Sequence, residues 1–447
     1  MTNYRKRLHD VIPGGAHTYS RGDDQFPDNA PPILVKGEGA YVWDPDGKRF
    51  LDYGMGLRSV NLGYGDKDVA KACYEEMLKG NNLTRASTTE LEAAELFKSL
   101  IPSVDMVKFA KHGSTVVTAA IKIARASTKR KYIVIPEEHP FFSFDDWFIG
   151  TTPLTSGTLP ESSAFTLKFK YNKIESLEKL FEEYPNQIAA VMLEPATTTG
   201  PCPRTCTSQN GCHDCSQPEN FLHKVKKVAH KNGALFILDE MITGFRWHLR
   251  GAQSFFNIEP DLCTFGKAMA NGFAVAALGG KKEFMQLGSI LDEGRERIFL
   301  TSTTHGAEMS ALGAFIKTVE ILKKENVIKH FWNYGEKLID EINRISNNLG
   351  IEEYFYLEGY PCSPNYVAKG NNKKTSLAFR TLFSQEMIKK NVLMPYIAIS
   401  YAHKQEELDL TLSAVESSLN IYKKALESGI DQYLHSSLIK PVFRKFN

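Results

Sequence analysis

The sequence has almost no net charge, and this absence excludes several kinds of partner. Its 447 residues include 54 lysines and arginines against 52 aspartates and glutamates, a formal net charge of +2 at pH 7. No basic stripe is present, so the chain lacks the electrostatic footprint of a nucleic-acid-binding protein. No apolar stretch approaches the roughly 20 residues of a membrane span, and residues 1–10 lack the apolar core of a secretion signal. We therefore expect a cytoplasmic protein that binds neither nucleic acid nor membrane.

Internal repeats and low-complexity tracts are also absent, which argues against a repeat protein. The hydrophobic fraction of 42% is ordinary for a globular protein. A chain of this length is long enough to bury a large core and to add a smaller domain. The composition thus agrees with a soluble enzyme, and the chemistry has to be read from particular residues.

Lys267 lies in a run of small and apolar residues, TFGKAMANG at 264–272, where a solvated lysine has little reason to be. An amine surrounded by apolar groups loses the solvation of its charged form, so its pKa falls and the free amine becomes nucleophilic. Such an amine can form a Schiff base with an aldehyde, which calls for a carbonyl cofactor. Taken alone, Lys267 could equally be a surface charge, and a second residue has to decide.

Asp239 ends a continuous apolar run, GALFILDE at 233–240, that is typical of a fully buried parallel strand. Open α/β sheets place their ligands at the carboxyl end of such strands. An aspartate there suits a pyridine nitrogen that must stay protonated, which is its role beside the lysine in pyridoxal phosphate enzymes. The alternative is a helix cap or a strand-end turn, and the joint presence of Asp239 and Lys267 argues against it.

Gly113 and Ser114 stand immediately before a helical pattern at 116–125. A glycine and a hydroxyl at a helix start expose backbone N–H groups at the positive end of the helix dipole, and this favours a phosphate. The same pair also occurs as a plain cap. Its order along the chain, ahead of the aspartate and the lysine, adds weight to the phosphate interpretation.

With these elements the chain resembles the class III, fold-type I pyridoxal phosphate aminotransferases, in the branch that includes glutamate-1-semialdehyde aminomutase. The resemblance covers nearly the whole chain, and its most specific string is DEMITGFR at 239–246. It implies an α/β fold whose large domain has a mostly parallel sheet flanked by helices. A smaller α+β domain would come from both chain ends, with boundaries at 1–60, 61–310 and 311–447. The other matching strings are IPGGAH at 12–17, GAYVWDPDGK at 39–48, LDY at 51–53 and IAAVMLEP at 188–195.

The resemblance also implies roles for the residues that already stood out. Lys267 would form the Schiff base with the cofactor, and Asp239 would pair with its pyridine nitrogen. Gly113 and Ser114 would hold its phosphate.

Three further residues take roles from the family pattern. Phe141, at the aromatic position of the family's Tyr-His-Gly motif, would stack on one face of the cofactor ring, and Met241 would press on the other. Thr303 matches a threonine that reaches the phosphate from the neighbouring subunit. The resemblance therefore implies a homodimer with a shared active site.

Departures from the family pattern concern the substrate more than the cofactor. The usual Asn-Ser-Gly-Thr-Glu-Ala reads KHGSTV at 111–116, so a glutamate near the substrate side of many relatives is missing. The usual Tyr-His-Gly becomes PFFS at 140–143, and Gly-Asn-Pro becomes GAE at 306–308. We expect cofactor binding to survive these changes, whereas the substrate cannot be deduced from them.

Arg21 is the candidate for holding a substrate carboxylate, because TYSR at 18–21 resembles the aminomutase segment whose arginine does this. A guanidinium fork pairs with two carboxylate oxygens at once. Arg58 is a second candidate, and a surface arginine in a flexible segment is the alternative for Arg21. Leu57 replaces a tryptophan of the aminomutase, which favours a transaminase over a strict aminomutase.

Four of the seven cysteines share one loop and are not explained by the family: Cys202, Cys206, Cys212 and Cys215. In a reducing compartment this spacing suits a structural zinc site of four thiolates better than disulfides. An iron–sulfur cluster needs the same ligands. The alternative is a loop of thiols without a metal.

Two classes of function remain open. The first is a pyridoxal phosphate transaminase that passes an amino group from an amino-acid donor, with glutamate expected, to a carbonyl acceptor; intramolecular transfer by an aminomutase is its variant. In this class Lys267 acts as a general base. The second class is a cofactor-binding protein without turnover. Such a protein has no need of Lys267 and Asp239 as a pair, and we therefore favour the enzyme.

Overall fold

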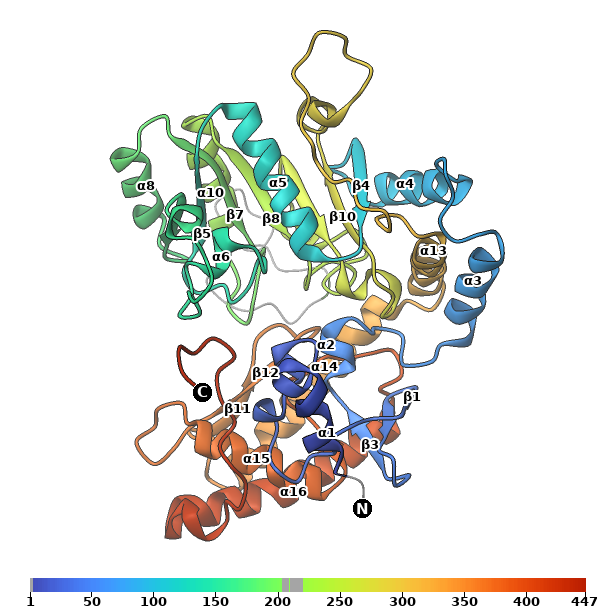
Figure 1. Cartoon of the computed structure of the whole chain (residues 1–447). Helices are drawn as coiled ribbons and strands as arrows, with labels where there is room; N and C mark the ends of the chain where they lie inside the picture. The colour runs from blue at the N-terminus through green and yellow to red at the C-terminus, as the bar shows by residue number, and fades with distance from the viewer. Residues whose placement is uncertain (1–2, 203–208, 210–219) are drawn as a thin grey trace. The chain divides into compact units, whose positions relative to one another are not determined.

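The computed structural model describes residues 3–202, 209 and 220–447, and the chain forms two compact units (Figure 1). The terminal unit comprises Met1–Asp66 and Lys329–Arg444, and the central unit comprises Lys67–Ile328 with Lys445–Asn447. The family resemblance predicts these divisions at 60/61 and 310/311. Helix α13 (Met309–Lys324) packs against α3 (Lys67–Leu78) and α4 (Thr88–Leu100), and it therefore belongs to the central unit.

The central unit contains a seven-stranded sheet in the order β4-β10-β9-β8-β7-β5-β6. β10 is antiparallel to both of its neighbours, and the other strand pairs are parallel. The predicted α/β fold with a mostly parallel sheet is confirmed. The strands are β4 (Met106–Ala110), β5 (Tyr132–Pro136), β6 (Thr166–Phe169), β7 (Ile188–Leu193), β8 (Leu235–Asp239), β9 (Leu262–Phe265) and β10 (Ala276–Gly280).

Helices bury the faces of this sheet. Every residue of β7 and β8 is buried, as expected for apolar strands in the middle of a parallel sheet. Helix α5 (Gly113–Thr128) packs across β4, β10, β9, β8 and β7, and Figure 1 shows it crossing the sheet. The remaining helical segments are α6 (Asp146–Ile149), α7 (Pro160–Ser163), α8 (Ile174–Glu183), α10 (Phe221–Lys231), α11 (Ala252–Phe255), η4 (Lys267–Ala270), α12 (Lys282–Met285) and η5 (Gln286–Gly288).

The terminal unit is built from both ends of the chain. Its four-stranded sheet has the order β1-β2-β3-β13, in which β13 joins β3 in parallel, and β11 pairs with β12 in a separate hairpin. The strands are β1 (Lys36–Glu38), β2 (Tyr41–Trp43), β3 (Arg49–Asp52), β11 (Phe355–Glu358), β12 (Asn365–Ala368) and β13 (Val392–Leu393). The helical segments are α1 (Tyr4–Val11), η1 (Pro13–Gly15), η2 (Tyr19–Arg21), η3 (Asp23–Gln25), α2 (Met55–Arg58), α14 (Val327–Asn348), α15 (Leu377–Lys389), α16 (Gln405–Ser428) and η6 (Ile430–Gln432).

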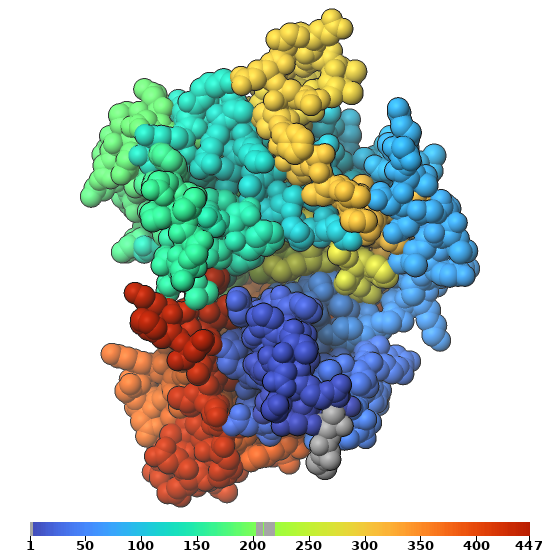
Figure 2. Space-filling view, in the orientation of Figure 1, coloured from blue at the N-terminus to red at the C-terminus, as the bar shows by residue number. Residues whose placement is uncertain are grey.

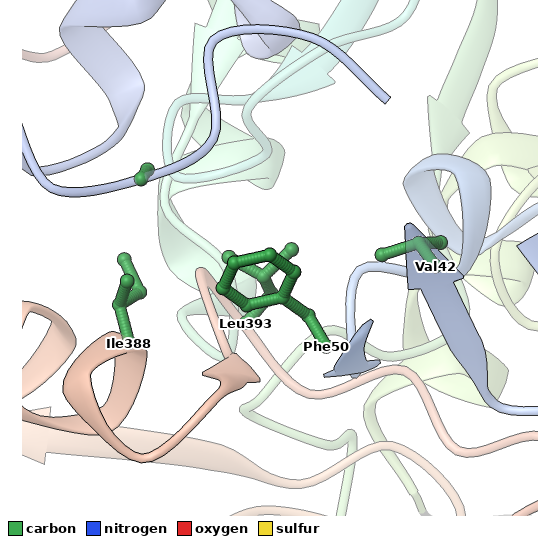
Figure 3. Close-up of a cluster of buried hydrophobic side chains, with 5 residues drawn as sticks. Val42, Phe50, Ile388 and Leu393 are labelled. Atoms are coloured by element: carbon green, nitrogen blue, oxygen red, sulfur yellow. The ribbon is translucent and has the colours of Figure 1, made fainter. Parts of the chain in front are cut away.

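A shared hydrophobic cluster joins the two chain ends. Val42 on β2 and Phe50 on β3 pack with Ile388 on α15 and Leu393 on β13, and Ala30 completes the group (Figure 3). All five side chains are buried. Burial of this apolar surface stabilises the association of segments that lie more than 300 positions apart in the sequence.

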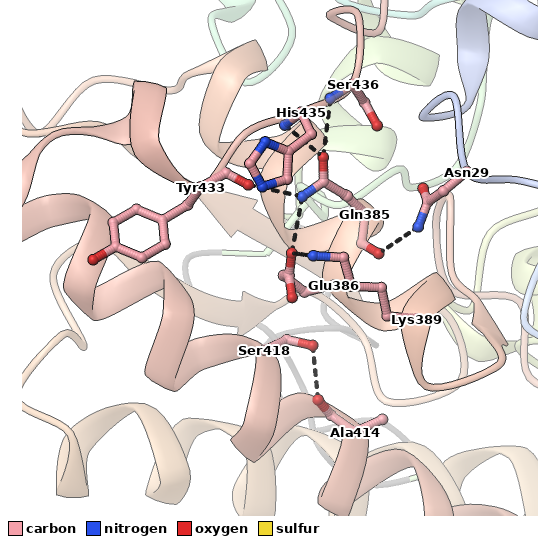
Figure 4. Close-up of polar contacts among 9 residues, drawn as sticks. All are labelled: Asn29, Gln385, Glu386, Lys389, Ala414, Ser418, Tyr433, His435 and Ser436. Atoms are coloured by element: carbon pink, nitrogen blue, oxygen red, sulfur yellow. Dashed lines mark hydrogen bonds and ion pairs between the residues drawn. The ribbon is translucent and has the colours of Figure 1, made fainter.

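Hydrogen bonds from α15 fasten the C-terminal tail to the same unit (Figure 4). The Gln385 Oε1 atom accepts hydrogen bonds from the backbone N–H groups of His435 (2.9 Å) and Ser436 (3.0 Å). The Gln385 backbone carbonyl accepts another from Asn29 Nδ2 at 2.9 Å. The tail and the N-terminal segment are therefore attached to one helix. Across the described part of the chain, every helix is too short or too polar to span a membrane.

Candidate active site

Asp239 and Lys267 lie at the carboxyl ends of neighbouring parallel strands. Asp239 is the last residue of β8, and its register partner on β9 is Thr264. Lys267 follows β9 after the single residue Gly266. Because β8 and β9 run in the same direction, both functional groups reach the same edge of the sheet, where open α/β sheets bind their ligands.

The Asp239 carboxylate is buried, with 2% of the residue exposed. Its Oδ1 atom accepts hydrogen bonds from the Met241 backbone N–H at 3.0 Å and from the Thr264 hydroxyl at 3.1 Å. Within the described ranges these are the hydrogen bonds of the carboxylate, so Oδ2 is available to a ligand. Burial raises the pKa of Asp239 to about 6, against the opposing effects of the Met241 N–H, the Lys267 charge and the Thr264 hydroxyl.

The backbone of Lys267 is in the left-handed region, with φ at 44°. This region costs free energy for a residue that carries a Cβ, and residues held there cluster at functional sites. The three following residues, Ala268, Met269 and Ala270, are buried, while Lys267 itself is half-buried. The packed turn η4 therefore fixes the backbone from which the Lys267 amine extends.

Met241 brings the start of α5 and the lysine segment together. A Cβ on Gly113 would lie 2.9 Å from the Met241 Sδ atom, and a Cβ on Gly266 would lie 2.7 Å from it. A side chain at either position would have to push the end of the Met241 side chain aside. Gly113, the first residue of α5, and Gly266, beside Lys267, therefore pack on the same thioether.

The first turn of α5 lies next to this contact. His112, its N-cap residue, makes no capping hydrogen bond through its side chain. Ser114 is buried, and its Oγ atom accepts a hydrogen bond from the Phe144 backbone N–H at 3.1 Å. The arrangement offers helix N–H groups to a phosphate, a buried carboxylate oxygen to a pyridine nitrogen and an amine to an aldehyde. These residues fit pyridoxal phosphate.

Phe141 lies in the loop after β5, at the same edge of the sheet. Its side chain is 44% exposed, and its ring meets Phe148 edge-on at a centroid distance of 5.7 Å. The loop is bound to α5, because Trp147 Nε1 donates to the Thr118 hydroxyl at 3.0 Å and this hydroxyl donates to Asp145. Phe141 is thus held by an ordered loop and keeps one part of its ring accessible.

Two departures from the family pattern pair with each other. Lys111, which replaces the usual asparagine, forms an ion pair with Glu308, which replaces the usual proline, at 2.5 Å. The Lys111 hydrogen bond lowers the pKa of Glu308. This pair joins the end of β4 to the loop that carries Thr303. Thr303 is exposed, and its carbonyl accepts a hydrogen bond from the Gly306 N–H at 3.1 Å.

Arg21 belongs to the terminal unit, whereas Lys267 belongs to the central unit. It is exposed and lines a cavity of about 590 Å³ within the terminal unit, together with Leu57 and Tyr64. Arg58 is held differently: its Nη1 atom donates to the Ser363 hydroxyl at 2.8 Å, and its guanidinium lies 5.0 Å from the centroid of the Tyr396 ring. Of the two arginines, Arg21 is the one on the cavity wall.

Sequence reasoning missed Thr264, which donates to Asp239, and His139, which is buried near the carboxyl end of β5. His139 Nδ1 accepts a hydrogen bond from the Glu194 backbone N–H at 3.1 Å, and burial lowers the pKa of the ring to about 3. The histidine is therefore neutral and ties the ends of β5 and β7. No local pattern marked Thr264, because its place opposite the last residue of β8 follows from the register of the two strands.

The cysteine loop lies mostly outside the described residues. Cys206, Cys212 and Cys215 are among those not described, and Cys202 is buried. Across residues 3–202, 209 and 220–447, no group of three or more histidine, cysteine, aspartate or glutamate side chains could hold a metal ion. The expectation of zinc therefore has no support.

Comparison with known proteins decides the family. The family model described as aminotransferase class-III matches residues 24–353. The chain belongs to the class III aminotransferases. Among curated relatives of this class III enzyme, glutamate-1-semialdehyde 2,1-aminomutase of Alkaliphilus oremlandii is 30% identical, over 93% of this chain and 97% of that protein. A 3-aminobutyryl-CoA aminotransferase of Cloacimonas acidaminovorans is 29% identical, over 93% and 95%.

Solved structures confirm the fold of this class III enzyme. FumI of Sphingopyxis sp. MTA144, determined in its PLP internal aldimine form, superposes with a TM-score of 0.83 over 95% of this chain and 97% of its own, at 23% identity. A glutamate-1-semialdehyde aminomutase of Pseudomonas aeruginosa PAO1 gives a TM-score of 0.79 over 94% of each chain, at 16% identity. The protein is thus a pyridoxal phosphate enzyme of the fold-type I class, with both transaminases and aminomutases among its relatives.

Proposed function

We propose that this protein transfers an amino group from an amino-acid donor, with glutamate as the first donor to test, to a separate carbonyl acceptor. The observation that carries the proposal is the convergence of Asp239, Lys267 and the first turn of α5 at one edge of the central sheet. Among the described residues, the hydrogen-bond donors to Asp239 both bind Oδ1, and a carboxylate with only a structural role would not need to keep its second oxygen for a ligand.

Each part of the cofactor has a protein group to hold it. Backbone N–H groups of Gly113 and Ser114 would bind the phosphate, Asp239 would accept from the pyridine nitrogen, and Phe141 and Met241 would cover the ring faces. When bound, pyridoxal phosphate supplies a carbonyl carbon for the amine and a ring that withdraws electrons. Asp239 would keep the ring nitrogen protonated, because a buried carboxylate stabilises a nearby cation.

Lys267 moves the proton. When it is not bonded to the cofactor, its Nζ atom would act as the general base that holds and moves the proton taken from the donor Cα. The packed η4 turn fixes the start of this side chain, so the amine would act from a fixed backbone. In the terminal unit, Arg21 binds a substrate carboxylate at the cavity wall.

The proposed enzyme is a homodimer in which Thr303 reaches the phosphate of the partner subunit's cofactor. Asn82 Nδ2 donates to the Thr304 carbonyl at 2.9 Å, so the Thr303 loop adjoins the segment between α3 and α4. This segment and its flanking helices, part of the surface in Figure 2, expose large apolar side chains that a second copy would cover. They are Tyr74, Met77, Leu78, Leu83 and Leu91, with exposed fractions of 50% to 70%.

A second candidate is intramolecular transfer, as in the aminomutases. The 30% identity to an aminomutase of Alkaliphilus oremlandii favours it. Leu57, which stands where the aminomutase has a tryptophan, favours the transaminase, because a smaller side chain leaves more of the cavity to a separate acceptor.

The test is the absorption spectrum of the purified protein loaded with pyridoxal phosphate, before and after addition of L-glutamate without an acceptor. We expect the band of the bound aldehyde form to be replaced by that of the amine form. A Lys267→Ala variant should bind the cofactor without this conversion. A spectrum unchanged by glutamate and by other amino acids, together with turnover of glutamate-1-semialdehyde, would establish the aminomutase instead.

A further inference from the structure

Four consecutive residues of the terminal unit have positive φ angles. Met55, Gly56, Leu57 and Arg58 have φ values of 40°, 56°, 61° and 66°, so α2 is a left-handed helical turn. Only glycine adopts this region without steric strain, and single residues rather than runs occupy it routinely. Three of the four residues carry large side chains, and each of them costs free energy in this conformation.

A buried carboxylate and a tyrosine hydroxyl hold the turn. Asp52 ends β3 and is 7% exposed; its Oδ1 accepts from the Gly54 N–H at 2.8 Å and its Oδ2 from the Met55 N–H at 3.0 Å. The Tyr64 hydroxyl donates to Asp52 Oδ2 at 2.6 Å and accepts from the Gly56 N–H at 2.7 Å. This one pair of side chains thus binds three successive N–H groups, the one just before the strained segment and the first two within it.

Further contacts fix the other side of the turn. Met55 is fully buried and packs with Val60 and Ala398. The Tyr396 hydroxyl donates to the Gly54 carbonyl at 3.1 Å, and the Ser59 hydroxyl donates to the Gly56 carbonyl at 2.6 Å. A strained backbone conformation persists only where several surrounding contacts hold it together, and such conformations are frequent at functional sites.

The turn forms part of the wall of the 590 Å³ cavity that Arg21 also lines. Gly56 and Leu57 of the turn, and Asp52 and Tyr64 that hold it, all lie on this wall. Elsewhere the wall is largely apolar, with contributions from Phe26, Ile33, Leu34, Val42, Leu393 and Pro395. The arginine therefore stands at the border of a largely apolar cavity.

We propose that Asp52 and Tyr64 are positioning residues, which hold the left-handed turn so that Leu57 forms a fixed wall against the apolar part of a carboxylate-bearing substrate. The proposal rests on the proposed function in taking Arg21 as the group that binds the substrate carboxylate. Glycine at position 57 would remove the strain, yet the chain has a leucine there. A side chain at this point of the wall is consequently the feature that the Asp52 and Tyr64 contacts maintain.

The strain is tested by stability, without reference to catalysis. Because position 57 is left-handed, the Leu57→Gly variant should unfold at a higher temperature than Leu57→Ala. Leu410 is a matched control, since it is exposed on the ordinary helix α16, where alanine is favoured over glycine. There Leu410→Gly should unfold at a lower temperature than Leu410→Ala. If the glycine variant unfolded at a lower temperature than the alanine variant at position 57 as well, the claim that this turn is strained would be wrong.

The positioning role is tested with Tyr64→Phe, which removes a hydroxyl that binds both the turn and its carboxylate. We expect KM for the carboxylate substrate to rise about tenfold, because Leu57 is then no longer held at its place on the wall, while kcat changes less than threefold. Hydrogen exchange of residues 54–58 should become faster. Tyr422→Phe is the control, because Tyr422 is buried and donates to the Lys369 carbonyl at 2.6 Å but does not line the cavity.

The outcomes separate this inference from the proposed function. Faster exchange at 54–58 with unchanged KM would overturn the positioning role and leave only a structural one. Unchanged hydrogen exchange of residues 54–58 in Tyr64→Phe would show that the tyrosine hydroxyl does not stabilise the turn. If the wild type showed no amino transfer, the proposed function would fail, whereas the stability order at position 57 and the exchange of the turn would still report on Asp52 and Tyr64.

Discussion

Asp239 in the central unit and Asp52 in the terminal unit are two buried carboxylates with the same local position and different hydrogen-bond partners. Each ends a β-strand, and each accepts hydrogen bonds from a following backbone N–H group and from a hydroxyl. Both carboxylate oxygens of Asp52 accept hydrogen bonds from its own unit. In the part of the chain that the structure describes, the two donors to Asp239 both bind Oδ1. The distribution of donors therefore distinguishes a carboxylate that shapes backbone from one that is kept for a ligand.

Exchanging each carboxylate for an amide should give the largest contrast. In Asp239→Asn the amide cannot stabilise a protonated pyridine nitrogen, and we expect turnover to fall by roughly 10²- to 10⁴-fold, the usual range for loss of such a proton-holding group. The protein should still fold and bind cofactor. In Asp52→Asn the loss should instead appear in stability, by about 1–3 kcal/mol, because backbone donors lose a charged acceptor. Equal effects of the two variants on turnover at saturating substrate would contradict the contrast.

The pH dependence of stability sharpens the same comparison. Burial raises the pKa of Asp239 from 3.8 to about 6, so between these values the folded protein holds a proton that the unfolded chain has lost. Stability from this group is therefore lost as pH rises from about 4 to about 6. In cofactor-free protein, the unfolding free energy of the wild type relative to Asp239→Asn should fall by about 3 kcal/mol over this window. Urea unfolding at several pH values checks this, and a constant difference would refute it.

The two arginines of the terminal unit provide a third contrast. Arg21 lines the cavity, and Arg58 is bound to Ser363 and stacked on Tyr396. Arg21→Ala should raise KM for a carboxylate substrate by roughly 10- to 100-fold through loss of a charged hydrogen-bonded pair, with little change in unfolding temperature. Arg58→Ala should mainly lower stability. Steady-state kinetics with both variants measures the difference. An unchanged KM in Arg21→Ala would show that another group binds the substrate carboxylate.

The smallest expected effect concerns the glycine contact at the start of α5. A Cβ at Gly113 would press on the Met241 Sδ atom at 2.9 Å. The end of the Met241 side chain is flexible and can shift, so the cost lies at or below the low end of the roughly 1–3 kcal/mol for overpacking, and we expect Gly113→Ala to weaken cofactor binding by roughly 3- to 5-fold. Gly370→Ala is the control, since a Cβ there would meet its nearest atom at 3.4 Å. Fluorescence titration with pyridoxal phosphate measures both, and equal affinities would contradict the packing argument.

The sequence was a good guide where one local pattern decides the structure. The apolar run before Asp239 predicted a buried strand, and Gly113 and Ser114 predicted the start of a helix; both are confirmed. The parallel order of β8 and β9 then places Lys267 beside Asp239. The chemical roles of these residues stay predictions.

Features that depend on distant contacts could not be predicted. The left-handed turn at Leu57 is stabilised by Asp52, Tyr64 and Tyr396, of which Tyr396 lies more than 300 positions away. Local propensity opposes that conformation, so no sequence window indicates it. The ion pair between Lys111 and Glu308 is similar: two separate departures from the family pattern are explained only by their contact.

The most direct test of the account asks which residue holds the cofactor. The protein loaded with pyridoxal phosphate is reduced with borohydride, which converts an imine into a stable amine, and is then digested and examined by peptide mass spectrometry. The account predicts a phosphopyridoxyl group on Lys267 and no such labelling in Lys267→Ala. Labelling of another lysine in the wild type, or of none while the cofactor is demonstrably bound, would contradict the assignment of the active site.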